Sequence, residues 1–109
     1  MDANDFVRDV RYTLVSMKAN HFADGSETLV ASVIADMGLT EKQKAQMEVI
    51  IGDVITDVAY AILLGIDGAA SLGESQQEFQ LYDENGHRVG GRDGEIEAAA
   101  FEELQDKLL

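Results

Sequence analysis

The sequence predicts a mainly helical α+β fold. Apolar residues recur at spacings of three and four along most of the chain, which is the period of amphipathic helices. Asn85-Gly86 lies between two short strand-like runs, a pattern typical of a β-hairpin. The 109 residues contain no proline, linker or low-complexity tract. We therefore expect residues 1–109 to form one domain with three N-terminal helices, a Gly-rich loop, one β-hairpin and a C-terminal helix.

The first two helices are predicted over residues 4–22 and 27–37. Asp2 or Asn4 can cap the first helix, and Ser26 is the expected cap of the second. Gly38 is expected to end the second helix. The residues expected to face inward are Phe6, Val10, Leu14 and Met17 in the first helix, and Leu29, Val30, Val33, Ile34 and Met37 in the second.

The third predicted helix, residues 41–64, carries the clearest apolar pattern and is expected to be the central helix of the core. Thr40 caps it, and at 1.5 Å per residue it is about 36 Å long. Gly52 costs about 1 kcal/mol relative to alanine, so either another backbone approaches it closely or the weakness is tolerated. The inward positions are Met47, Ile50, Ile51, Val54, Ile55, Val58, Ala59, Ile62 and Leu63.

A loop, a hairpin and a last helix are predicted for the remainder. Gly65, Gly68 and Gly73 indicate the loop. The hairpin pairs residues 79–82 with residues 87–89, and it must lie on the helices or pair with another chain, because an isolated hairpin is only marginally stable. The final helix is predicted over residues 95–108, with Ile96, Ala100, Leu104 and Leu108 inward.

Charge is the feature of the composition that bears most on function. The chain has 21 acidic and 8 basic residues, a formal net charge of −13, and no Lys or Arg between Lys44 and Arg88. Such a surface repels nucleic-acid phosphates and attracts basic proteins, although a high charge also serves solubility alone. We expect a basic protein partner, with contacts drawn from the acids of the basic-free stretch: Asp53, Asp57, Asp67, Glu74, Glu78, Asp83 and Glu84.

Several other classes are not expected. There are no cysteines for disulfides or thiolate metal sites. The first residues lack the basic and apolar regions of a secretory signal, which favours a cytoplasmic location. The apolar stretch 49–66 contains Asp53 and Asp57, each costing about 2.5 to 3.5 kcal/mol near a bilayer centre, so no membrane span is expected.

Chemistry at particular residues is weakly indicated, and we expect neither an enzyme nor a cofactor. Asp53 and Asp57 lie one helical turn apart and could hold a cation, although an acidic face is the more common reason for such a pair. Residues 83–94 fail as a calcium loop, because Arg88 and Gly94 stand where Gly and Glu are required. His21 and His87 have no defined catalytic partner.

The chain resembles, in composition alone, immunity proteins that protect bacteria from nuclease toxins: it is short, acidic and free of cysteine. We therefore expect a protein-binding module, either an immunity protein or another inhibitor of a basic protein. The first alternative is a structural homodimer formed through the central helix or the hairpin edge. The second is a metal-dependent enzyme that uses Asp53 and Asp57.

Overall fold

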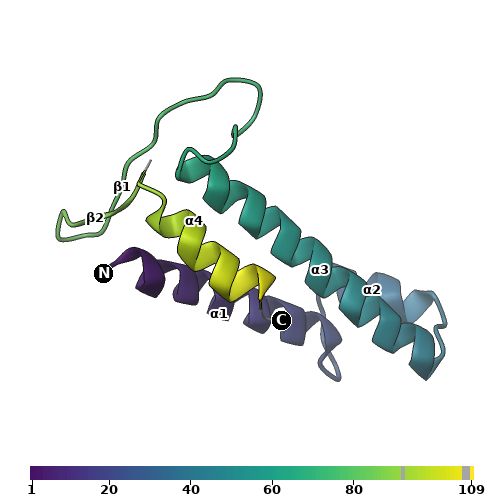
Figure 1. The fold of residues 1–109 in the computed structure, drawn as a ribbon. Coiled ribbons are helices and arrows are strands. Elements are labelled where there is room, and N and C mark those ends of the chain that lie inside the picture. Colours follow the sequence, from purple (N-terminus) through teal and green to yellow (C-terminus); the bar gives the residue numbers. More distant parts are fainter. Residues whose placement is uncertain (92, 107–108) are drawn as a thin grey trace.

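Helices and one hairpin make up the computed structural model, which describes residues 1–91, 93–106 and 109 (Figure 1). The predicted mainly helical α+β class and the order of the elements are confirmed. In chain order the elements are α1 (Ala3–Phe22), α2 (Leu29–Asp36), α3 (Glu41–Ile66), β1 (Leu81–Tyr82), β2 (Arg88–Gly90), α4 (Glu95–Ala100) and the π-helical turn η1 (Phe101–Gln105).

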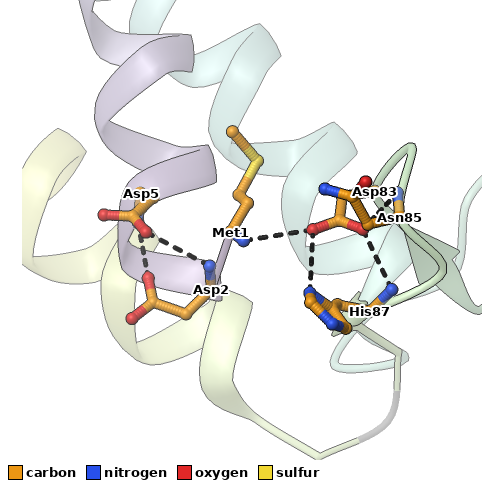
Figure 2. Close-up of polar contacts among 6 residues, drawn as sticks. All are labelled: Met1, Asp2, Asp5, Asp83, Asn85 and His87. Atoms are coloured by element: carbon orange, nitrogen blue, oxygen red, sulfur yellow. Dashed lines mark hydrogen bonds and ion pairs between the residues drawn. The ribbon is translucent and has the colours of Figure 1, made fainter.

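The capping residues show why α1 and α3 begin where they do. The Asp2 carboxylate accepts a hydrogen bond of 2.8 Å from the Asp5 amide, and the Asp5 carboxylate accepts one from the Asp2 amide. The two bonds form a capping box (Figure 2). Thr40 and Gln43 form the same arrangement at α3. The caps expected at Asp2 and Thr40 are therefore confirmed.

The start of α2 differs from the prediction. Thr28, not Ser26, is the N-cap, and its hydroxyl oxygen accepts from the Ala31 amide at 3.0 Å. The Thr28 hydroxyl also lies 3.0 Å from Nδ1 of His21 at the end of α1, so a contact outside the helix holds this side chain in place. Ser26 instead accepts from the Thr28 amide in the preceding turn.

The core lies where α1, the C-terminal half of α3, and α4 with η1 meet (Figure 1). The inward positions predicted for the last helix are confirmed at Ile96, Ala100 and Leu104, whereas Leu108 lies outside the described residues. On α1, Leu14 is buried as expected, but Val7 is fully buried and Met17 is exposed. The stripe of α1 is therefore rotated toward Ala3 and Val7 relative to the prediction.

The hairpin lies on the helices, which is one of the two arrangements expected from the sequence. β1 and β2 pair antiparallel, with Leu81 opposite Gly90, and Gly86 adopts a φ of 80° in the turn. Val89 is buried, and the Ile96 side chain occupies the space where a side chain at Gly90 would lie. β2 contacts both α1 and α4.

The prediction that α3 is the central buried helix is wrong for much of its apolar stripe. Leu63 is buried, and Met47, Ile51, Ile55 and Ala59 are partly buried. Ile50, Val54, Val58 and Ile62 are between 45 and 56% exposed. The reason is geometric, because α1 and α4 cover one side of α3, while its apolar residues extend around the helix onto another.

The inward assignments for α2 also need correction. Ile34 is buried and Val30 is partly buried, but Leu29, Val33 and Met37 are each more than half exposed. These three residues recur every four positions, so they form one row on the outer side of α2. We call Leu29, Val33 and Met37 the α2 row.

The chain is open for its size. Its radius of gyration is 16.3 Å, whereas about 13 Å is usual for a domain of this length. Its accessible surface is 7219 Å², whereas a folded monomer of this mass exposes about 5,900 Å². The excess is about 1,300 Å², to which the exposed loop at residues 69–78 and the uncovered sides of α2 and α3 contribute.

Candidate interaction surface

The most prominent exposed apolar feature lies on α3. Ile50, Val54, Val58 and Ile62 recur every four residues, and we call them the α3 ridge. Side chains four positions apart form one of the ridges by which helices pack into the grooves of other helices. The α3 ridge spans 12 residues, or about 18 Å along the helix.

An adjoining side of the same helix already packs in the core. Leu63 belongs to the buried cluster, and Ile55 and Ala59 pack against it. A helix that is apolar on both sides is normally buried on both sides. The α3 ridge is therefore an exposed apolar surface on a helix whose other apolar residues pack in the core.

Helix α2 lies near the N-terminal half of α3. Ile34 and Ala35 of α2 line a groove of about 310 Å³ together with Glu41 and Lys44 of α3, so the two helices are neighbours at this end. Figure 1 shows α2 beside the first turns of α3. The exposed apolar side chains of the protein thus include two rows on adjacent helices.

Two of the predicted acids border the α3 ridge. Asp53 and Asp57 are exposed on α3. With about 100° of rotation per residue, Asp57 lies about 20° and Asp53 about 60° from the direction of Ile50, both on the side away from Ile62. The α3 ridge therefore has a carboxylate flank.

Asp67 lies in the interior. It is 3% exposed, and its carboxylate accepts hydrogen bonds from the backbone amides of Gly91 at 3.2 Å and Glu97 at 2.9 Å. Gly94, which precedes α4, has no side chain to cap that helix. Asp67 supplies the missing acceptor from the end of α3, so its carboxylate holds the fold together and is not presented to a partner.

Asp83 ties the hairpin to the N-terminus, as Figure 2 shows. Its carboxylate accepts from the amides of Asn85 and His87 at 2.9 Å and from the Met1 amino group at 3.1 Å. These contacts, the His87 amide first, lower the pKa of Asp83 to about 2. The hydrogen bond between the Met1 amino group and the Asp83 carboxylate also raises the pKa of the amino group. This carboxylate is therefore engaged within the chain.

The remaining predicted acids, Glu74, Glu78 and Glu84, are exposed away from α3. Glu74 and Glu78 lie in the loop before β1, and Glu84 lies in the hairpin turn. The seven acids thus occupy different elements, and two of them have structural roles. Sequence reasoning missed the role of Asp67 because the amides that it binds are 24 and 30 positions away, and missed the tie from Asp83 to the N-terminus because Met1 is 82 positions away.

Two further kinds of site, a metal centre and a membrane span, depend on particular side chains. Among the described residues, no group of three or more His, Cys, Asp or Glu side chains is placed to hold a metal ion. Helix α3 is long and apolar enough to cross a membrane by length and composition alone, and 22% of its most apolar window is buried. The expected absence of a membrane span stays a prediction.

Comparisons of the chain with protein-family models, curated proteins and solved structures find no match. The chain's own surface offers the exposed α3 ridge with a carboxylate flank, on a helix packed in the core from its other side. Exposed apolar patches on folded proteins mark contacts with other proteins or with membranes.

Proposed function

We propose that this chain is a protein-binding module that contacts its partner through the α3 ridge. The observation that carries the proposal is the exposure of Ile50, Val54, Val58 and Ile62 on a helix anchored in the core. Because an adjoining side of α3 is packed in the core, the ridge is a rigid element that needs little reordering on binding. Rigid surfaces lose less conformational entropy when they bind.

The energy available is of the right order for such a contact. Full burial of a Val, Ile, Leu or Met side chain contributes about 1.5 to 3 kcal/mol. The half-exposed side chains of the α3 ridge would add about 1 kcal/mol each, or about 4 kcal/mol, and the α2 row about as much again. A partner contributes its own buried surface, and the total must exceed an association cost of about 4 to 15 kcal/mol.

The flank of the α3 ridge suits a polypeptide partner more than a lipid bilayer. Asp53 and Asp57 could meet cationic groups at the rim of an interface, where charge remains partly hydrated. A basic protein is one partner that fits this arrangement, as in an immunity protein or other inhibitor. A second copy of the chain is the other.

Site-specific photo-crosslinking inside cells tests the proposal. A photoreactive residue at Val54 should give a crosslinked product, whereas the same residue at Tyr12, an exposed position on α1, should give none. Adding Val58→Lys should abolish the Val54 product, because a charge would be buried in the contact. Equal yields from Val54 and Tyr12, or no polypeptide product at Val54, would overturn the proposal.

A further inference from the structure

Resting on the proposed function, we infer that the partner is a second copy of this chain, whose α3 packs antiparallel on the α3 ridge. The dimer has a two-fold axis that crosses the interface between Val54 and Val58, at the level of Thr56 along the helix. Such an interface is isologous, so each contact between two different positions occurs twice.

The order of the ridge residues suits this symmetry. With the axis near Thr56, Ile50 of one chain faces Ile62 of the second copy, and Val54 faces Val58. The larger residues meet at the two ends and the smaller ones at the centre, where the helix axes approach most closely.

The excess surface matches the area that a dimer needs. The chain exposes 7219 Å², about 1,300 Å² more than a compact monomer of its mass. A standard interface takes about 800 Å² from each partner, and obligate homodimers take more than about 1,000 Å². Covering the α3 ridge would bring the exposed area toward the usual value.

Lys44 distinguishes the antiparallel from the parallel arrangement. It lies 18 residues before Ile62, which is five helical turns, so it shares the direction of the C-terminal end of the α3 ridge. In an antiparallel pair Lys44 lies beside the C-terminal end of the second copy's α3, where helix carbonyls favour a cation. A parallel pair would place Lys44 of one chain beside Lys44 of the second copy, where the two positive charges repel.

The acids set the salt dependence of the dimer. A two-fold axis between antiparallel helices brings the same flank of both chains together, so Asp53 and Asp57 of each copy line one side of the interface. These like charges repel, and the net charge of −13 on each chain adds to the repulsion. Salt should therefore strengthen the dimer, whereas it would weaken binding to a basic protein.

Sedimentation equilibrium of the purified full chain tests the dimer. The expected mass is twice 11.9 kDa. The dissociation constant of the dimer should decrease as the salt concentration is raised from about 0.05 M to about 0.5 M. Asp57→Asn should lower the dissociation constant further, by about threefold at low salt. Val54→Lys should be monomeric, while Tyr12→Lys should remain dimeric. Circular dichroism of each variant verifies that the helices are retained.

Crosslinking tests the orientation, because the natural chain has no cysteine. A bismaleimide much shorter than the about 18 Å between positions 50 and 62 should join an Ile50→Cys chain to an Ile62→Cys chain when the two are mixed. Each variant alone should stay unlinked. Linkage of Ile50→Cys to itself would overturn the antiparallel arrangement.

The remaining outcomes separate this inference from the proposed function. A monomeric wild type, a dimer that survives Val54→Lys, or a dimer that dissociates as salt rises would each overturn the inference. A monomer that still crosslinks from Val54 to a different protein in cells would leave the proposed function standing. A monomer that gives no protein crosslink and binds neutral lipid vesicles through Val54 would overturn both.

Discussion

Replacing Asp67 by alanine should remove the contact that joins the end of α3 to the start of α4. The Asp67 carboxylate is 3% exposed and accepts from the amides of Gly91 and Glu97. In Asp67→Ala both amides lose their acceptor. The Glu97 amide lies in the first turn of α4, so the substitution also removes the cap of that helix.

The magnitude follows from these two bonds. A hydrogen bond to a charged group contributes about 1.5 to 3 kcal/mol, and burial prevents water from replacing it fully. The expected loss in the free energy of unfolding is about 4 kcal/mol for Asp67→Ala. Asp67→Asn keeps one acceptor oxygen and should lose about half as much. In a domain of this size each kcal/mol lowers Tm by about 4 °C, so the alanine variant should melt about 15 °C lower.

Urea unfolding followed by circular dichroism measures the loss. All samples need the same protein concentration, since association with a second copy would make stability concentration-dependent. Asp24→Ala, at an exposed loop position, is the matched control and should stay within about 0.5 kcal/mol of the wild type. If Asp67→Ala is as stable as this control, the structural role assigned to the carboxylate is refuted.

Three further predictions concern backbone space and pH. Gly91→Ala should destabilise by about 2 kcal/mol or more in urea unfolding, because φ is 127° and the added methyl would meet the Phe79 carbonyl. Gly52→Ala should stabilise by up to about 1 kcal/mol in the same assay, because the nearest obstacle is the flexible Lys18 side chain at 3.2 Å. A clear loss of stability would show that Lys18 cannot move. The contribution of Asp83 to folding stability should be complete above its unfolded pKa of 3.8 and should decline as the pH falls toward about 2. In Asp83→Asn, the urea midpoint should therefore depend less on pH across this range than in the wild type. The same pH dependence in both proteins would contradict this prediction.

The features predicted correctly from sequence depend on residues close together in the chain. Asp2 and Thr40 cap helices through bonds that span three residues. Asn85-Gly86 specifies the hairpin because the turn requires a positive φ at Gly86. The α2 cap was misplaced by two residues because both Ser26 and Thr28 can cap, and the contact of Thr28 with His21 is not visible in local sequence.

The burial of α3 could not be predicted because periodicity reports that a side is apolar, not what covers it. Leu63 and Val58 belong to the same apolar pattern, yet Leu63 is in the core and Val58 is exposed. A residue that packs within its own chain and one that packs on a partner share the same physical requirement, removal from water. Asp67 illustrates the opposite failure, since an acid in an acidic chain gives no sign that two distant amides surround it.

The net charge and the α3 ridge together bear on how far association can proceed. An isologous contact uses the same ridge on both chains, so pairing consumes it and leaves no complementary copy for a third chain. The pair then carries twice the charge of −13, spread over the remaining surface. Like charge opposes further contact through weaker apolar sites, such as Tyr12 or Phe101, both more than half exposed. Assembly should therefore end at two chains, and bringing the solution to the isoelectric point, about pH 4.2, where the net charge vanishes, should produce larger species in light scattering.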